Sequence, residues 1–161
     1  YHRLKSIRTH GISDVINCCF TIPGFNFRFT DIQASIGLAQ LKRLPTRIEH
    51  VKAIYNKYAA ALGKLSFLKL LTVDIAEGAI PIYVETLCED RSAIVKHLAK
   101  NAIQVRPFYP DLDKAPYFND KNKYSNSEVF GKHGIFLPCG PDQSLTNIDI
   151  VLEALSSFQT N

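Results

Sequence analysis

Residues 24–44 read GFNFRFTDIQASIGLAQLKRL, and they predict a loop that turns into a long helix. Thr30 is followed three residues later by Gln33, which is the capping-box pattern: each side chain accepts a hydrogen bond from the other residue's backbone N–H. Apolar Ile32 and Ile36 follow at helical spacing. We therefore expect the longest helix of the fold to begin at Thr30.

The loop before this helix offers two polar side chains, Asn26 and Arg28. A helix N-terminus carries unpaired N–H groups and a partial positive charge, so the loop and the helix start together would suit a phosphate group. The alternative is an ordinary capped helix whose Arg28 is a solvated surface charge, because capped helices are common. The residues of this segment leave both interpretations open.

Composition narrows the class of protein. With 161 residues, the chain has the size of one domain and can bury a core. The net charge of +4 is modest, and basic and acidic residues are interspersed, so we expect no nucleic-acid partner. The sequence has no apolar run long enough to span a bilayer and no secretion signal at its start. We expect a soluble cytoplasmic protein without a membrane partner.

The cysteines and histidines do not predict a metal site. The five histidines form no H-x-x-x-H pair. The cysteines have no C-x-x-C spacing, and we expect them to be reduced thiols; they are Cys18, Cys19, Cys88 and Cys139. The sequence begins at Tyr1 and contains no methionine, from which we expect a fragment of a longer protein.

The first part of the chain is predicted to be helical with one connecting loop. Residues 2–9 predict a short helix that ends near His10-Gly11, and residues 12–29 predict a loop. The helix from Thr30 reaches Pro45, which either kinks it or begins a new helix. An apolar stripe then continues to Gly63, where the helical pattern ends.

The rest of the chain predicts short strands among helices. The helix starts are marked by Asp90, by a capping box formed by Ser125 and Glu128, and by Thr146. Residues 109–124 predict an exposed loop. The predicted strands are 67–73, 80–87, 103–108 and 135–139. This order predicts an α/β or α+β layered domain.

Three segments carry a resemblance to a known family. Residues 24–41 resemble the signature G-Y/F-N-Y/F-R-M/L-T-D/N-I/L-Q-A-A-I-G-L-A/V-Q-L of the DegT/DnrJ/EryC1/StrS aminotransferases, which use pyridoxal 5'-phosphate (PLP). Residues 103–110, IQVRPFYP, resemble the family's G-I-x-x-R-P-F-F/Y-x-P segment, and residues 137–155 resemble its closing motif. The resemblance covers nearly the whole chain.

The resemblance implies a fold and a place within a larger enzyme. The implied fold is the small C-terminal α+β domain of fold-type I PLP-dependent transferases, a small sheet packed with helices and preceded by a long helix. Residues 1–29 would be the end of the PLP-binding large domain with its connecting loop. Residues 30–161 would be the long helix and the small domain.

The resemblance also implies roles for individual residues. Family enzymes are homodimers with the active site at the interface, where Asn26 would donate a hydrogen bond to the phosphate of the partner's PLP. Arg28 would add positive charge nearby or bind substrate. Arg106 and Tyr109 lie where a predicted strand gives way to a loop, a position from which their side chains could bind the nucleotide-sugar substrate, although the stem of Arg106 packing against Phe108 is equally open. The family often has histidine where this chain has Asp113, which bears on the substrate.

The covalent cofactor site is missing from these residues. In the family, the lysine that forms the Schiff base lies in an S-x-S/T-x-x-K context, which does not occur here, and the lysines present have the contexts of surface residues. We therefore assign no catalytic residue and expect the isolated chain to be inactive. We also expect exposed apolar surface where the large domain would lie.

Two functions follow from these residues. The leading one is the C-terminal portion of an aminotransferase that converts the keto group of a nucleotide-linked sugar to an amine, with glutamate as donor, in cell-surface polysaccharide biosynthesis. The alternative is a non-catalytic dimerisation or ligand-binding module derived from the family.

Overall fold

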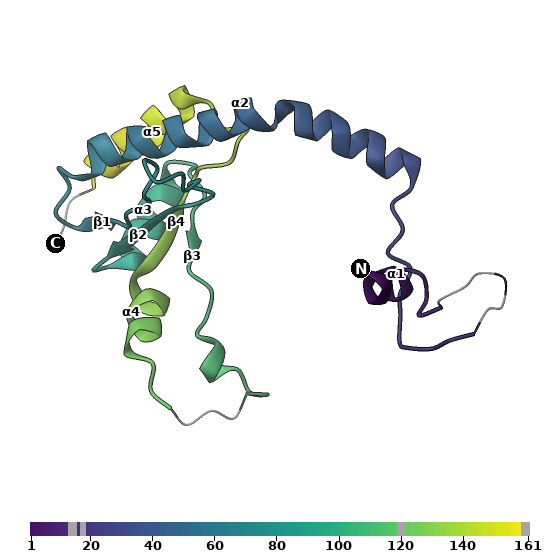
Figure 1. Ribbon diagram of the computed structural model, residues 1–161. Helices are drawn as coiled ribbons and strands as arrows, with labels where there is room; N and C mark the ends of the chain where they lie inside the picture. Colours follow the sequence, from purple (N-terminus) through teal and green to yellow (C-terminus); the bar gives the residue numbers. More distant parts are fainter. Residues whose placement is uncertain (13–15, 17–18, 119–121, 159–161) are drawn as a thin grey trace. The chain divides into compact units, whose positions relative to one another are not determined.

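Figure 1 shows a computed structural model of the chain, which describes residues 1–12, 16, 19–118 and 122–158. The chain divides into two compact units, Tyr1–Pro45 and Thr46–Asn161. The predicted domain boundary between residues 29 and 30 stays a prediction. The expectation that Cys18 is a reduced thiol falls outside the described residues, whereas Cys19, Cys88 and Cys139 are free cysteines.

The first unit begins with helix α1 (His2–Arg8), as predicted. Residues 25–27 lie along the end of this helix and are joined to it by backbone hydrogen bonds. The N–H groups of Phe25 and Phe27 donate to the carbonyls of Ile7 and Arg8 at 2.8 and 3.0 Å, and the His10 N–H donates to Phe25 at 2.9 Å. These bonds position the loop that precedes the long helix.

Two glycines allow the loop to cross the end of α1. Gly11 has φ +79°, which is the left-handed region that glycine adopts most easily. A Cβ on Gly24 would overlap the backbone of Gly11, and a Cβ on Gly11 would overlap the carbonyl of Ile22. The backbone of residues 22–24 therefore lies directly against Gly11, and no larger residue fits at either position.

Helix α2 (Asp31–Leu62) begins with the predicted capping box. The Thr30 N–H donates to Gln33 Oε1 at 3.0 Å, and the Gln33 N–H donates to Thr30 Oγ1 at 3.2 Å. Pro45 lies inside this helix, so of the two predicted alternatives the start of a new helix is wrong. Proline removes one hydrogen bond, and the residues beyond it are retained in the helix by packing in the core of the second unit.

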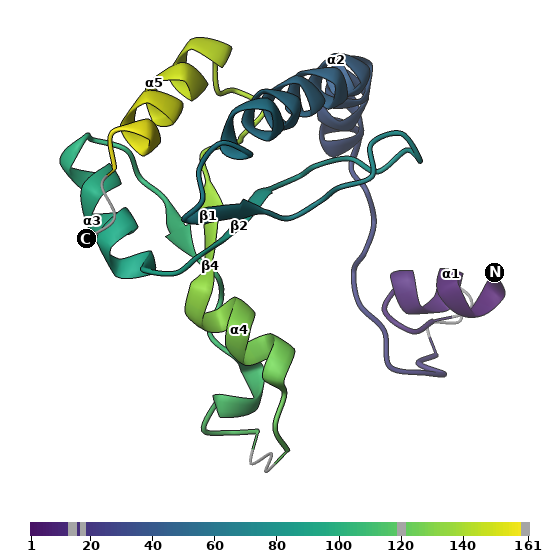
Figure 2. The ribbon, with the colours of Figure 1, turned by 90° about the vertical axis from the view of Figure 1, so that its left-hand side faces the viewer.

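The second unit is a four-stranded antiparallel sheet covered on one face by helices. The strand order is β1-β2-β4-β3. Figure 2 shows α3, α5 and the C-terminal half of α2 on the same side of the sheet. The elements are β1 (Leu68–Leu70), β2 (Val84–Cys88), α3 (Arg91–Lys100), β3 (Arg106–Pro107), the 3-10 helix η1 (Leu112–Lys114), α4 (Ser125–His133), β4 (Gly134–Leu137) and α5 (Leu145–Ser156). This order and the α/β class confirm the prediction.

The core lies between the sheet and the three covering helices. Along β2, Val84, Thr86 and Cys88 are buried, while the residues between them are less so, which is the period-two pattern of a strand with one covered face. Tyr58 is fully buried, and its hydroxyl donates to the Pro138 carbonyl at 2.9 Å. The core includes Ile54 and Leu62 from α2, Ile94 and Leu98 from α3, Ile148, Val151 and Leu155 from α5, and Leu68, Ile135 and Leu137 from the strands.

The strands are shorter than the sequence predicts. β1 ends at Leu70, because the Tyr55 hydroxyl donates to the Leu71 carbonyl at 3.1 Å and accepts the Val73 N–H at 2.8 Å. These backbone groups are thus satisfied without a strand partner. β2 begins only at Val84. Pro81, three residues earlier, has no backbone N–H to donate to a neighbouring strand.

The third strand is reduced to two residues, Arg106 and Pro107, instead of the predicted 103–108. Ala102 has φ +57°, and the Ile103 N–H donates back to the Leu98 carbonyl at 2.9 Å. These residues therefore close the end of α3 and are not available to the sheet.

Of the three helix starts predicted after residue 63, two need correction. Asp90 caps α3 as predicted, with the Ala93 N–H donating to its carboxylate at 2.9 Å. Within the described part of the chain, no side chain caps α4, so the capping box of Ser125 and Glu128 is wrong. Ser144 caps α5 in place of Thr146 and accepts the Asn147 N–H at 3.0 Å.

Candidate functional site

The loop of Asn26 and Arg28 presents two free polar side chains. Both residues are exposed, and neither side chain has a hydrogen-bond or ion-pair partner among the residues that the structure describes. The backbone of Asn26 is nevertheless held in place, because it pairs with Thr9 in an antiparallel bridge. The loop therefore fixes the backbone of Asn26 and leaves the hydrogen-bonding capacity of its side-chain amide unused within the described residues.

The N-terminus of α2 contributes less to an anion site than the sequence suggests. The capping box already occupies the Gln33 N–H, and Asp31 places a negative charge in the first turn. An anion at this loop would therefore be bound by the side chains of Asn26 and Arg28. An amide has two N–H donors and a guanidinium has five, which suits the oxygens of a phosphate.

In the second unit, the structure brings Arg106 and Tyr109 together. Both line a cavity of about 790 Å³ at the β3 edge of the sheet. Arg106 pairs with Phe136 across the two strands, so their side chains lie on the same face of the sheet. The Tyr109 ring contacts the Phe136 ring with centroids 6.2 Å apart. This face is the one opposite the core.

Sequence reasoning missed two residues of this cavity, Tyr83 and Phe136. Phe136 lies between the buried residues Ile135 and Leu137 of β4, and its ring also contacts Tyr83 at 5.1 Å. The alternation along β4 could have assigned Phe136 to the outer face. The pairing that brings Tyr83 beside it depends on the register of the sheet, which no local pattern predicts.

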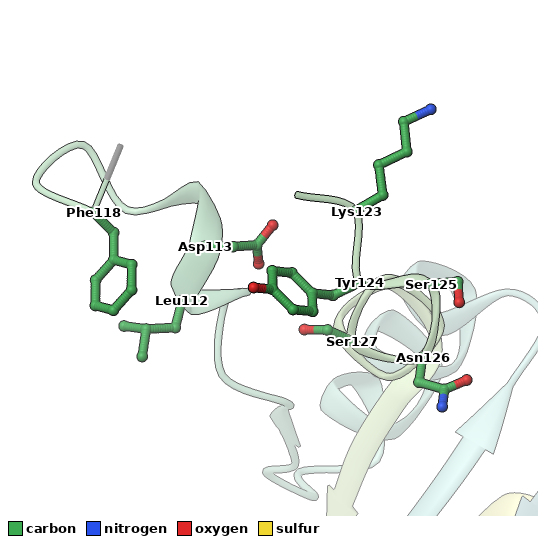
Figure 3. Close-up of a pocket in the computed structure, with 8 residues that line it drawn as sticks. All are labelled: Leu112, Asp113, Phe118, Lys123, Tyr124, Ser125, Asn126 and Ser127. Carbon is green, nitrogen blue, oxygen red and sulfur yellow. The ribbon is translucent and has the colours of Figure 1, made fainter. Parts of the chain in front are cut away.

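A second cavity of about 550 Å³ lies between η1 and the start of α4. Asp113, the position at which the resembled family often has histidine, is one of its lining residues. In Figure 3 the side chain of Tyr124 points from the start of α4 toward η1, whereas Lys123 extends away. The departure from the family pattern at residue 113 therefore lies in a cavity wall.

Asp111 joins η1 to α4. Its side chain is only 7% exposed and accepts hydrogen bonds from Lys114 Nζ at 2.6 Å and Ser127 Oγ at 3.0 Å. The hydrogen bond from Lys114 lowers the pKa of Asp111 below its ordinary value, with a smaller lowering from Ser127. A Cβ on Gly131 would overlap the carboxylate, so the glycine at this position of α4 leaves the space that the Asp111 side chain occupies.

The described residues form no candidate metal site, and two of their cysteines, Cys88 and Cys139, have raised pKa values. No group of three or more His, Cys, Asp or Glu side chains gathers there in a way that could hold a metal ion. Burial raises the pKa of Cys88 to about 11 and raises the pKa of Cys139, so both thiols are protonated at neutral pH. Among these same residues, no helix has the length and apolar character of a membrane span.

The sequence matches a known family over almost its full length. The family described as "DegT/DnrJ/EryC1/StrS aminotransferase family" matches residues 1–156. A putative pyridoxal phosphate-dependent aminotransferase, EpsN of Bacillus subtilis, is 31% identical over 142 residues, which is 82% of this chain and 36% of that protein. GDP-perosamine synthase of Escherichia coli O157:H7 is 26% identical over 163 residues, which is 100% of this chain and 45% of that protein. The chain thus spans less than half the length of these relatives.

Solved structures share the fold. The aminotransferase TlmJ from Streptoalloteichus hindustanus matches with a TM-score of 0.86 and 18% identity over 95% of this chain and 43% of that one. The E. coli GDP-4-keto-6-deoxy-D-mannose-3-dehydratase with bound hydrated PLP matches with a TM-score of 0.78 and 23% identity over 96% and 47%. At these identities the likeness concerns the fold.

Proposed function

We propose, because this chain belongs to the DegT/DnrJ/EryC1/StrS aminotransferase family, that it is the C-terminal portion of a PLP-dependent aminotransferase acting on a nucleotide-linked keto sugar. Glutamate is the proposed amino donor, and the lysine that binds the cofactor lies outside these residues. The names of relatives such as GDP-perosamine synthase support the substrate class, and EpsN supports the cofactor.

PLP, when bound, acts as an electron sink that allows an amino group to be exchanged for a keto group. The contribution of this chain is to bind and orient. In the proposed homodimer, the Asn26 amide donates a hydrogen bond to the phosphate of the cofactor in the partner subunit. Arg28, two residues further on, adds positive charge beside that phosphate or binds the substrate.

The observation that carries this proposal is the state of Asn26. Its backbone is bridged to Thr9, while its amide is exposed and has no partner within the described residues. Because the backbone is already ordered, only the side chain of Asn26 loses conformational entropy when it binds a ligand. Arg106 and Tyr109 are proposed to bind the substrate from the cavity beside β3.

The test is Asn26→Ala in the longer protein that carries this chain together with the lysine segment. A hydrogen bond to a charged group contributes about 1.5–3 kcal/mol, so PLP should bind about tenfold more weakly or worse. Cofactor retention is measured by the PLP absorbance that remains after dialysis, and the circular dichroism spectrum checks the fold.

Asn56→Ala is the matched control, since Asn56 is also an exposed asparagine but lies within α2. It should leave PLP affinity unchanged. If Asn26→Ala retains PLP as well as the control does, the assignment of Asn26 to the phosphate is wrong. If the longer protein binds no PLP at all, the result favours the alternative function, a non-catalytic dimerisation or ligand-binding module, over the aminotransferase.

A further inference from the structure

We infer that the cavity beside β3 binds the nucleoside diphosphate part of the substrate, with the base against Tyr83, Phe136 and Tyr109 and a phosphate on Arg106. This inference rests on the proposed function, which assigns a nucleotide-linked substrate to the protein. The inference specifies which part of the substrate this cavity binds. It also includes two residues, Tyr83 and Phe136, that belong to none of the sequence motifs.

The aromatic residues form a surface on which a planar ring can stack. Phe136 is at the centre, with ring centroids 5.1 Å from Tyr83 and 6.2 Å from Tyr109. Tyr83 and Tyr109 are 53% and 75% exposed, and in the described part of the molecule their two rings make no contact with each other. Phe108 stacks on Phe136 at 4.4 Å and so supports it. Exposed rings around a supported ring are suited to stacking with a nucleobase.

Charge favours an anionic ligand in the same cavity. Of the described residues that line it, none is Asp or Glu, and Arg106 is the one that carries a charge. Glu85 lies beside the aromatic surface without lining this cavity, because it pairs with Phe136 from β2. The Arg106 side chain makes no ion pair or hydrogen bond with the residues described here. A guanidinium binds phosphate oxygens through two parallel hydrogen bonds. The pairing of Arg106 with Phe136 places this group next to the aromatic surface, as a base and its phosphates require.

Side-chain amides line another part of the same cavity, toward α3 and α5. Asn101, Gln104, Gln143 and Asn147 also line the cavity. The Asn101 amide donates to the His97 carbonyl at 2.9 Å, and the Asn147 amide donates to Gln143 at 3.1 Å, so each asparagine is positioned while its own oxygen stays available as an acceptor. A few fixed polar groups on a largely apolar lining are typical of ligand pockets.

The size of the cavity agrees with this ligand. Its volume of about 790 Å³ lies within the range of roughly 300–1,000 Å³ that small-molecule sites occupy. The lining also includes the buried apolar residues Ile103, Leu137 and Val151, whereas Arg106 is exposed.

The test is calorimetric titration of the purified 161-residue chain with GDP and with UDP, and with guanosine and inorganic pyrophosphate as the two halves of the ligand. Arg106→Gln should weaken GDP binding about tenfold or more, because a hydrogen-bonded charge is lost, and should leave guanosine binding unchanged. Tyr83→Leu should weaken GDP and guanosine binding by a similar factor, because a stacking ring is lost, and should leave pyrophosphate binding unchanged.

Arg43→Gln and Tyr117→Leu are the matched controls, since both residues are exposed and lie outside the cavity. They should bind GDP as the unaltered chain does. The inference is overturned if the chain binds neither nucleotide, or if Arg106→Gln and Tyr83→Leu bind GDP no more weakly than the controls.

These outcomes are separable from the test of the proposed function. Asn26 lies in the first unit and does not line this cavity. If the 161-residue chain binds no nucleotide, while PLP retention in the longer protein does depend on Asn26, only the nucleotide site is overturned. Nucleotide binding that depends on Arg106, with PLP retention indifferent to Asn26, would overturn the cofactor assignment alone.

Discussion

Asp111 shows at the scale of one residue how this protein holds a loop in place. Its carboxylate is almost fully covered and accepts hydrogen bonds from Lys114 and Ser127. Lys114 belongs to η1 and Ser127 to α4, so one side chain joins two elements. The absence of a side chain at Gly131 makes room for it.

This contact makes stability depend on pH. The pKa of Asp111 is lowered in the folded protein, so its stabilising contribution is present above the unfolded pKa of about 4 and is lost as pH falls through the folded pKa. Asp111→Asn should therefore lose less stability than the unaltered chain when the pH falls from about 5 to about 2. Urea unfolding at a series of pH values measures this.

Asp142→Asn serves as the control for that experiment. The Asp142 side chain is 88% exposed and lies 3.9 Å from Arg47, a pair that contributes little in water. Its pH dependence should equal that of the unaltered chain. If Asp111→Asn also shows the unaltered pH dependence, Asp111 does not hold η1 to α4 in solution.

At the start of α5, Ser144 and Thr146 lie two positions apart, and either could serve as the N-cap of the helix. Ser144 and Thr146 are both good N-cap residues, and the sequence alone favours Thr146. The turn before the helix decides for Ser144, because the Gln143 N–H donates to the Gly140 carbonyl at 2.9 Å and leads the chain directly into the helix at Leu145.

Removing each hydroxyl in turn tests which residue is the cap. Ser144→Ala should lower the free energy of unfolding by about 1 kcal/mol, because the Asn147 N–H loses its acceptor. Thr146→Ala should change it by only a few tenths of a kcal/mol, since threonine is a poor residue inside a helix and alanine a good one. Urea unfolding of both variants gives the comparison, and a larger loss for Thr146→Ala would contradict the assignment.

Over the whole molecule, burial is distributed unequally between the two units. The core of buried side chains lies in the second unit, Thr46–Asn161. Among the described residues of the first unit, only Gly11 and Ile12 are buried. Large apolar side chains there are exposed instead; they include Phe25, Phe27, Phe29, Ile32, Ile36, Leu38, Leu41 and Leu44.

Native-state hydrogen exchange of the 161-residue chain should reveal this difference. The amides of Ile135 and Leu155, in the core, should exchange only on global unfolding. The amides of Phe25 and Phe27 should show protection factors lower by about a hundredfold or more, because little apolar surface must be exposed to open their bonds. Equal protection in both units would contradict the unequal distribution of burial.

Local patterns predicted the elements whose signals lie within a few residues of one another. The capping box at Thr30 and Gln33 and the Asp90 cap form as expected, since partners three residues apart meet as soon as the helix forms. Strand ends were predicted less well, because long-range partners decide them: Tyr55 supplies hydrogen bonds that end β1.

The same distinction holds for the candidate sites. The motifs single out Asn26, Arg28, Arg106 and Tyr109, but they do not show that Arg106 and Tyr109 line one cavity. Tyr83 and Phe136 carry no motif and enter the site through strand pairing. Whether these residues bind cofactor and substrate stays a prediction.

The sequence by itself determined the family and the order of the elements, because both are encoded in motifs and patterns of contiguous residues. It also determined the start of the long helix, because the capping side chains bond to nearby backbone groups. Only the tertiary structure decided which side chains share a cavity. Arg106 meets Phe136 because β3 pairs with β4, although 29 positions separate the two residues in the chain, and such a register depends on how the whole sheet packs against its helices.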